Sequence, residues 1–297
     1  MRRRVRSAVR ITVVVPTTNR ADLTRRTVER LGRQVRQPDR ILVVAVTAGD
    51  VEGLAAAVAD VQIELAPRGL CSQRNRALQL VRGDADLIVF FDDDFVPCET
   101  YLANAERFFE QHEDIVGATG RILADGARGE GIDFEAAVAL TQAHRTPAEP
   151  RVQSMNSLYG CNMVIRASAT EGLWFDENLP LYGWQEDIDF TYRLGARGRL
   201  AAYEALAGVH MGHKGGRSAG KRLGYSQIAN PIYLLGKRSM PRDLAARLLT
   251  RNIASNVLRS FRPEPHVDRR GRLAGNLLAI RDLLIGRLHP QRIMQIQ

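Results

Sequence analysis

The sequence contains few cysteines, few aromatic residues and no long hydrophobic run. Its three cysteines, Cys71, Cys98 and Cys161, are scattered, and no CxxC pair occurs. Such a set predicts neither a disulfide framework nor a zinc site, and a reducing cytosol fits it best. No apolar run approaches the roughly 20 residues that a bilayer-spanning helix needs. The apolar run at residues 11–15 is too short for an export signal and stops at Pro16.

Charge is unevenly distributed along a chain of otherwise ordinary composition. Of the 297 residues, 45% are hydrophobic and 25% are charged, which is typical of a globular protein. Residues 1–10 carry five arginines and no acidic residue, and residues 241–297 carry eleven arginines against four acidic residues. Because the net charge is +9, the middle of the chain is mildly acidic. Nucleic-acid binding would place basic residues across the main domain, so no nucleic-acid partner is expected. Basic ends favour contact with an anionic membrane.

Apolar segments and helical patterns alternate through the first part of the chain. The expected strands lie within 9–20, 39–50, 62–67 and 85–91, and the expected helices within 21–34, 51–61, 71–83 and 99–112. The strand segments are apolar throughout, which is typical of a mainly parallel sheet covered on both faces. Ligands of such sheets bind beyond the carboxyl ends of the strands. Pro16–Arg20, Asp50 and Asp92–Asp94 fall at those ends.

The pattern changes twice in the second half of the chain. Residues 125–155 lose periodicity and are rich in Gly, Pro and charge, so a mobile loop region is expected there. Beyond residue 240, apolar residues recur at helical spacing with arginines on the other faces. This indicates a basic amphipathic helical extension.

Three adjacent carboxylates follow the fourth apolar run, in LIVFFDDDFV from Leu87 to Val96. Asp92, Asp93 and Asp94 repel one another and are costly beside a hydrophobic run unless a cation lies among them. Mg²⁺ and Mn²⁺ prefer oxygen ligands and commonly take one or two carboxylates, with phosphate oxygens in the remaining positions. The triplet therefore indicates either a metal–diphosphate site or an exposed acidic turn.

Further motifs stand in a fixed order around this triplet. They are PTTNR after the first strand, the Arg74–Asn75 pair in a helix, GCNMVIR at 160–166, Glu186–Asp187 before IDFTYRLGARG, and the downstream His210. Together, over roughly residues 11–220, they resemble the inverting family 2 glycosyltransferases that build bacterial polysaccharides and glycoconjugates. The resemblance implies an α/β fold of the GT-A type, which is Rossmann-like with a mainly parallel sheet flanked by helices, here followed by a C-terminal helical appendage.

The resemblance also implies a nucleotide-sugar donor and a divalent cation, Mn²⁺ or Mg²⁺. Asp94 and His210 would hold the metal, with His213 as the competing ligand, and the metal would stabilise the departing nucleoside diphosphate. The residues implied in donor binding are Pro16, Thr17, Asn19, Arg20, Asp50, Arg74, Asp92 and Asp93. Many family members have acids directly after the second strand to hold the nucleobase, but Ala45 and Val46 stand there. The base would instead be read by Asp50, Thr17 or backbone, so guanosine and thymidine donors stay open beside uridine.

Asp187 is the implied general base, because a carboxylate must take the proton of the attacking acceptor hydroxyl. Glu186 would position the acceptor or the base. The same acids also suit an ordinary helix start, where the dipole favours negative charge. Asn162 and Trp184 would contact the acceptor, although a loop-bracing amide and a core aromatic fit these two residues equally well.

These expectations give a domain plan. It has a basic tail over 1–10, a catalytic domain over 11–240 and a helical extension over 241–297. Within the catalytic domain, 11–120 would bind the nucleotide and 121–240 the acceptor, which would be a saccharide or a polyprenyl-linked saccharide. The protein would be cytoplasmic, or peripheral at the inner face of the cell membrane with 241–297 on anionic lipid.

Two other functions fit part of the sequence. A haloacid-dehalogenase-type phosphohydrolase would use Asp92 and Asp94 in an Asp-x-Asp-x-Val loop, but that loop normally follows the first strand and needs a later lysine. A non-enzymatic protein that binds anionic surfaces would explain the basic ends. It would leave the acidic triplet and the Glu186–Asp187 pair without a purpose.

Overall fold

The structure is a computed structural model that describes residues 9–58, 60–213, 220–262, 264 and 267–296. Most of the predicted basic tail, residues 1–8, therefore lies outside the described residues. The strands are β1 (Ile11–Pro16), β2 (Arg40–Ala45), β3 (Val61–Leu65), β4 (Leu87–Phe91), β5 (Phe95–Pro97), β6 (Ile115–Asp125), β7 (Val152–Met155), β8 (Asn162–Arg166) and β9 (Arg199–His210). The α-helices are α1 (Ala21–Leu31), α2 (Leu54–Ala57), α3 (Leu70–Val81), α4 (Tyr101–Gln111), α5 (Phe134–Ala143), α6 (Glu186–Leu194), α7 (Gly220–Lys237), α8 (Arg242–Ser260) and α9 (Arg269–Leu284).

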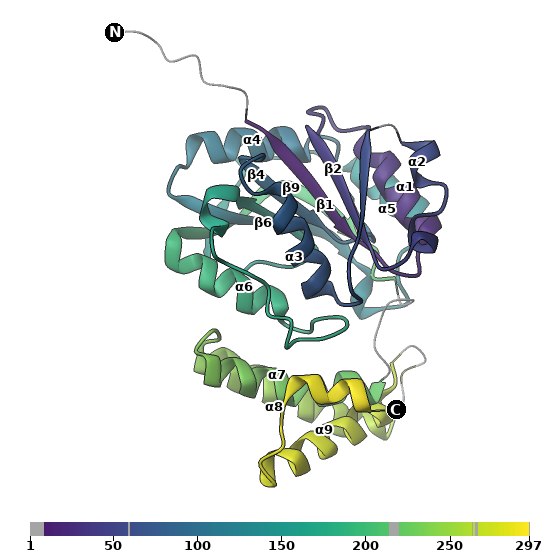
Figure 1. The fold of residues 1–297 in the computed structure, drawn as a ribbon, viewed down its shortest axis with the longest axis vertical. Coiled ribbons are helices and arrows are strands. Elements are labelled where there is room, and N and C mark those ends of the chain that lie inside the picture. Colours follow the sequence, from purple (N-terminus) through teal and green to yellow (C-terminus); the bar gives the residue numbers. More distant parts are fainter. Residues whose placement is uncertain (1–8, 59, 214–219, 263, 265–266, 297) are drawn as a thin grey trace.

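One mixed sheet of nine strands forms the centre of the molecule (Figure 1). Its order is β3-β2-β1-β4-β8-β6-β9-β5, and β7 pairs with β9. The strands β3, β2, β1 and β4 are parallel, whereas β8 runs antiparallel to both β4 and β6. The expected α/β fold with a mainly parallel sheet is confirmed, and the carboxyl ends of the parallel strands form one rim.

Both faces of the sheet are buried, as the apolar strand sequences predict. On β1, Val13 and Val15 pack with residues of α1 and α4, while Val14 packs on the opposite face with residues of α3 and α6. All three valines have no exposed surface. Burying an apolar side chain of this kind contributes about 1.5–3 kcal/mol. The rim is therefore anchored by a core on either side.

The expectation of a structureless loop over 125–155 is wrong. Helix α5 and strand β7 lie within this segment. Asp133 caps α5 by accepting hydrogen bonds from the backbone N–H groups of Glu135 and Ala136, and Ala137 is fully buried. The expected helix over 51–61 is also wrong in extent. Of the described residues in this range, only the four of α2 are α-helical, and they follow Gly53, which is in a left-handed conformation (φ 74°).

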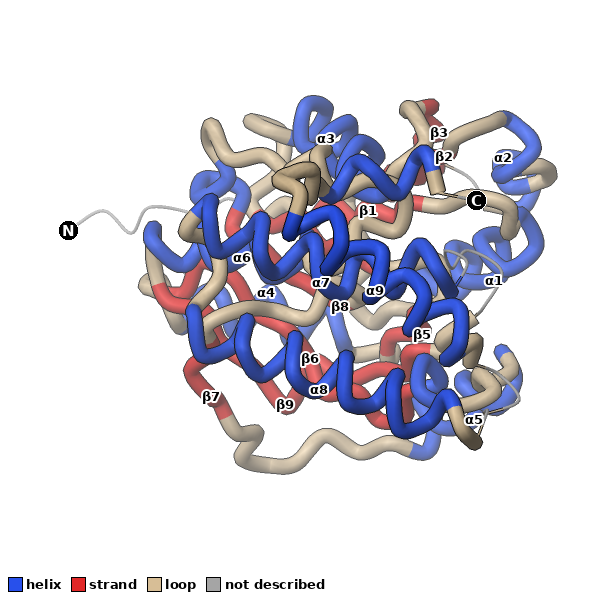
Figure 2. The backbone as a smooth tube through the Cα atoms, turned by 90° about the horizontal axis from the view of Figure 1, so that it is seen from below, coloured by secondary structure: helices blue, strands red, loops and turns tan. Residues whose placement is uncertain are grey.

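The three C-terminal helices lie together beneath the sheet in Figure 1, and Figure 2 shows them across the underside of the molecule. Helices α7 and α9 cross closely, because a Cβ atom added to Gly224 or Gly275 would lie 2.0 Å from a backbone oxygen of the other helix. This layer begins with α7, and α8 and α9 make up most of residues 241–297. None of the described helices combines the length and hydrophobicity needed to cross a bilayer.

Candidate active site

Asp93 holds the loop that follows β1. Its carboxylate accepts hydrogen bonds from Thr17 Oγ1 at 2.8 Å and from Arg20 Nη1 at 2.6 Å. Burial and the neighbouring Asp94 raise the pKa of Asp93 to about 7, although Arg20 opposes this change. Both carboxylate oxygens thus bind protein groups. Among the three aspartates, Asp92 has the most exposed side chain, at 22%.

Asp92, Asp94 and His210 form a cluster suited to a metal ion. Their ligand atoms lie within 4.8 Å of one another, and Asp94 Oδ1 is 3.5 Å from His210 Nε2. Strand pairing produces this proximity, since Phe95 on β5 is opposite His210 on β9. Two carboxylates and one imidazole are a donor set that fits Mn²⁺ or Mg²⁺. His213 contacts the same site differently, because its backbone N–H donates to Asp94 Oδ2 at 2.8 Å.

Asp125 orients His210. Its Oδ1 is 2.9 Å from His210 Nδ1, so Nε2 is directed at Asp94. Burial lowers the pKa of His210, but hydrogen bonds to Asp125 and Asp94 outweigh it and raise that pKa to about 10. A carboxylate on the far nitrogen of a histidine is the usual partner of a metal-binding imidazole. Sequence analysis missed Asp125 because it opens the segment that was expected to be a loop.

Arg74 is fully buried and connects several parts of the site. Its guanidinium donates to Glu186 Oε1, to Asp92 Oδ1 at 2.9 Å and to the carbonyl of Gly160 at 2.9 Å. Arg74 is therefore a buried structural arginine and does not lie on the surface. Burial raises the pKa of Glu186 to about 8 although Arg74 opposes it. Arg74 thus links the acidic triplet on the rim to the start of α6.

Asp187 lies next to this network, at the start of α6. Its Oδ2 accepts from the Gly160 N–H at 3.0 Å and its Oδ1 from the Ile188 N–H at 2.8 Å. Burial raises the pKa of Asp187, although these two N–H groups act against the rise. Gly160 therefore contacts Asp187 through its N–H and Arg74 through its carbonyl, so three hydrogen bonds in series connect Asp187 to Asp92.

Two other predicted residues, Asp50 and Asn162, are buried and make hydrogen bonds within the protein. Asp50 is buried and accepts from the backbone N–H groups of Asn19, Val46 and Thr47, so it braces the loops after β1 and β2. These hydrogen bonds outweigh burial, which would raise its pKa, and hold the pKa of Asp50 below its ordinary value. Asn162 is also fully buried, with Oδ1 bound by Thr119.

Trp184 is half-buried beside Tyr182, with ring centroids 6.4 Å apart. Asn230 on α7 donates to the Trp184 carbonyl at 2.6 Å. Helix α7 therefore holds the segment that precedes α6.

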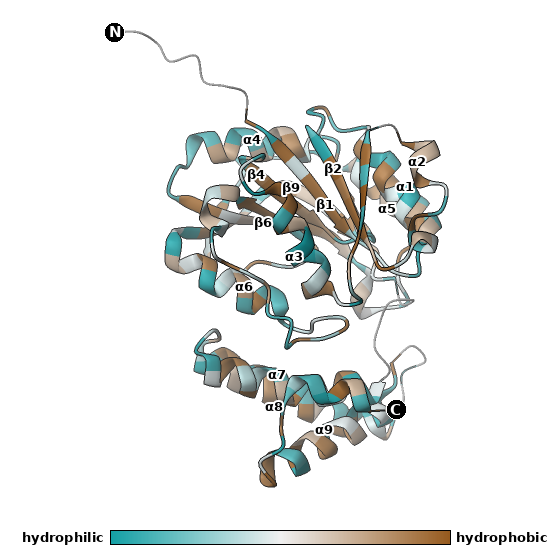
Figure 3. Cartoon of the chain, in the orientation of Figure 1, coloured by the Kyte–Doolittle hydropathy of each residue, from teal (hydrophilic) through white to brown (hydrophobic). Residues whose placement is uncertain are grey.

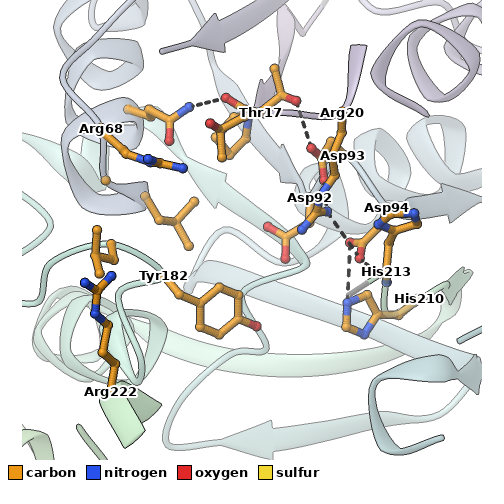
Figure 4. Close-up of a pocket in the computed structure, with 16 residues that line it drawn as sticks. Thr17, Arg20, Arg68, Asp92, Asp93, Asp94, Tyr182, His210, His213 and Arg222 are labelled. Atoms are coloured by element: carbon orange, nitrogen blue, oxygen red, sulfur yellow. Dashed lines mark hydrogen bonds and ion pairs between the residues drawn. The ribbon is translucent and has the colours of Figure 1, made fainter. Parts of the chain in front are cut away.

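A cavity of about 240 Å³ opens at the rim. Figure 4 shows Asp94 and His210 at one side of it, Asp92 and Tyr182 in the middle, and Arg68 and Arg222 at the other side. Pro16, Thr17 and Arg20 also line this cavity, whereas Asn19, Asp50, Arg74, Asn162, Trp184, Glu186 and Asp187 do not. Arg68, Tyr182 and Arg222 also line the cavity, although no sequence pattern assigned them a role.

A protein-family model described as glycosyl transferase family 2 matches residues 12–174, which is more than half of the chain. No curated protein matches the chain by sequence.

Solved structures share the fold at low sequence identity. The structure of S. aureus TarS residues 1–349 in complex with UDP-GlcNAc has 15% identity and a TM-score of 0.56, covering 97% of this chain and 84% of that one. The mannosyltransferase PcManGT from Pyrobaculum calidifontis, in complex with GDP-Man and Mn²⁺, has 17% identity and a TM-score of 0.56, covering 98% and 86%. A longer structure of S. aureus TarS has 16% identity and a TM-score of 0.53, and this chain spans 44% of its length.

Proposed function

The chain belongs to glycosyl transferase family 2 and has the GT-A fold, and from this premise we propose that it is a metal-dependent, inverting glycosyltransferase. It would move a sugar from a nucleotide-diphosphate sugar to a hydroxyl of a saccharide or lipid-linked acceptor. One observation carries the proposal. Asp92, Asp94 and His210 converge beside a cavity, and Arg74 and Gly160 connect Asp187 to the same rim.

The donor would lie in the cavity, with its diphosphate toward Asp94 and His210. A divalent cation held by Asp92, Asp94 and His210 would supply Lewis-acid stabilisation of the charge on the departing nucleoside diphosphate. Pro16 and Thr17 would line the nucleoside part of the site, where both residues face the cavity. Asn19 and Asp50 would act through the loop that they brace, since the Asn19 N–H donates to Asp50 Oδ1 at 2.6 Å.

Asp187 would act as the general base. The acceptor oxygen attacks the anomeric carbon opposite the diphosphate, the new C–O bond forms as the bond to the diphosphate breaks, and the hydroxyl proton moves to the Asp187 carboxylate. A raised pKa favours this role, because it makes the carboxylate a better proton acceptor. Glu186, paired with Arg74, would hold the start of α6 in place. Trp184 would border the acceptor, and Asn162 would support the strand beneath it.

The domain plan follows from the same site. We assign residues 11–120 to the nucleotide-binding half and 121–240 to the acceptor half, because both halves line the cavity. We assign 241–297 to a helical extension at the inner face of a bacterial cell membrane, where a polyprenyl-linked acceptor would be available. Exposed apolar residues on α8 and α9, such as Leu258 and Leu284, support that placement.

A thermal-shift screen of nucleoside diphosphates and nucleotide-sugars, with and without Mn²⁺, tests the proposal. UDP-GlcNAc and GDP-Man are suitable first donors, because the two similar structures contain them. We expect one nucleoside diphosphate to stabilise the protein with Mn²⁺ only, and Asp94→Ala to abolish the effect. Stabilisation by no nucleotide, or release of phosphate from simple phosphate esters, would contradict the proposal.

A further inference from the structure

Two arginines line the part of the cavity that is remote from the metal ligands. Arg68 is exposed and lies between β3 and α3, whereas Arg222 is half-buried on α7. In Figure 4 both lie on the side of Tyr182 away from Asp94 and His210. Nothing in the proposed transfer step uses either side chain.

The two sides of the cavity differ in how their charges are balanced. Asp94 lies 3.6 Å from Arg20 and 3.5 Å from His210. Within the described part of the chain, by contrast, no carboxylate lies within ion-pair distance of Arg68 or Arg222. Two guanidinium groups that line one cavity repel each other unless an anion lies between them. The planar guanidinium fork matches the oxygens of a phosphate group.

Arg222 is held in place by the last residues that the structure describes. Its Nε donates to the backbone carbonyl of Ile296 at 2.7 Å, and its two terminal NH₂ groups have no hydrogen-bond partner among the described residues. The side chain lines the cavity. Ile296 is 5% exposed and packs with Tyr225 and Ile228 of α7. A side chain fixed in this way loses less conformational entropy when it binds a ligand.

We propose that Arg68 and Arg222 form a phosphate-binding pair, and that the segment 290–296 positions Arg222 for it. This inference rests on the proposed function and adds a substrate group to it. The phosphate is one carried by the acceptor, because the proposed function directs the donor's diphosphate to Asp94 and His210 on the other side of the cavity. The C-terminal helical layer is then part of the substrate site, although the family match ends at residue 174.

Binding measurements on the full chain test the pair. GDP, UDP and inorganic phosphate are titrated into the wild type, Arg222→Ala, Arg222→Lys and Arg68→Ala by calorimetry in the presence of Mn²⁺. Arg287→Ala is the matched control, because Arg287 is an exposed arginine of the same C-terminal region. We expect Arg222→Ala to weaken the binding of inorganic phosphate by about tenfold or more, as loss of a charged hydrogen bond does. Arg222→Lys should recover part of it, since lysine keeps the charge but not the fork.

The ligands separate the two sources of phosphate. Weaker binding of GDP or UDP in Arg222→Ala would mean that the pair binds the donor diphosphate, and would overturn its assignment to the acceptor. Unchanged nucleotide binding with weaker binding of inorganic phosphate identifies an acceptor phosphate. If the Arg68 and Arg222 variants bind all three ligands with the same affinity as Arg287→Ala, the two arginines do not bind phosphate. If neither GDP nor UDP binds, dTDP is titrated as well. A wild type that binds none of the three nucleotides contradicts the proposed function instead, and the inorganic phosphate titration still decides on the pair.

Discussion

The carboxyl groups of the site differ because their neighbours differ. Asp94 faces His210, Arg20 and the His213 N–H, and these outweigh burial and lower its pKa. Asp93 is buried with two acidic neighbours, and its pKa rises to about 7. Asp187 has no cation in direct contact among the described residues, and burial raises its pKa. A low pKa suits a metal ligand, and a raised pKa suits a base.

Replacing Asp187 should lower the rate of transfer without changing nucleotide affinity. We expect Asp187→Asn to lower kcat by about 10²–10⁴-fold, the usual contribution of a general base, while the affinity for the nucleoside diphosphate stays unchanged. The control is Asp243→Asn, at an exposed acid in the first turn of α8. Equal loss of kcat and nucleotide affinity would show that Asp187 is not the base.

The pH profile of the wild type provides an independent check on Asp187. A base must be deprotonated, so kcat/KM should fall as pH drops through the pKa of Asp187. Because burial raises this pKa above its ordinary value of 3.8, the acidic limb should lie at higher pH than for an exposed aspartate. Rates measured over a pH series, with stability checked at each pH, would show the limb. A rate that stays constant down to pH 3.8 would contradict the assignment.

Metal affinity should depend on Asp125. Its carboxylate is 2.9 Å from His210 Nδ1, and loss of such a partner typically weakens metal binding by about 10–100-fold. We therefore expect Asp125→Asn to bind Mn²⁺ more weakly than the wild type in a titration without donor, followed by electron paramagnetic resonance. Asp133→Asn, which changes the cap of the neighbouring helix α5, controls for local destabilisation. Equal Mn²⁺ affinity in wild type and Asp125→Asn would exclude the positioning role.

Lys237 connects α7 to α6, the helix that begins with Glu186 and Asp187. Its Nζ lies 2.6 Å from Asp176 Oδ2 and 2.8 Å from Asp189 Oδ1 on α6. Asp189 is fully buried, so removing the ammonium leaves a buried carboxylate with Arg193 as its remaining cation. We expect Lys237→Met to lower the free energy of unfolding by about 2–3 kcal/mol, measured in urea at pH 7.

The loss of unfolding free energy in Lys237→Met should depend on pH. Burial raises the pKa of Asp176, but Lys237 and other donors outweigh it and hold that pKa below 3.8. A depressed pKa contributes stability that is present above the unfolded value and lost as pH falls through the folded value. The difference between wild type and Lys237→Met should therefore shrink below pH 3.8. Arg242→Met, at an exposed arginine nearby, should show no such difference at any pH.

Sequence patterns predicted the parts of this fold that depend on neighbours along the chain. The strands β1, β2 and β4 are continuous apolar runs, so their burial on both faces followed directly. Burial of Arg74 depends on Glu186, which is 112 residues away, and no local pattern shows such a partner. Helix α5 was missed because it buries only Ala137 and Thr141 and so lacks a strong apolar stripe.

For the whole molecule, the C-terminal helices present an apolar and basic surface. Among the described residues, sixteen large apolar residues are exposed, and half of them lie between Val257 and Met294. Phe261 is 79% exposed and Leu284 82%. Figure 3 shows hydrophobic segments in this layer, away from the sheet. Arg247 and Arg251 on α8 have no carboxylate partner among the described residues. Apolar side chains with unpaired arginines fit the surface of an anionic bilayer.

Vesicle flotation tests whether this surface binds a membrane. We expect the wild type to float with vesicles that contain phosphatidylglycerol, to float less with neutral vesicles, and to dissociate as salt screens the arginines. Changing both Phe261 and Leu284 to Ser should weaken binding about 100-fold or more, because each buried side chain contributes about 1.5–3 kcal/mol. Leu65→Ser, at a 53% exposed leucine on β3, is the control and should float like the wild type. The alternative result is a protein that does not bind anionic vesicles but forms dimers, which the same double change disrupts. In that case a second copy of the chain covers this face, and not lipid.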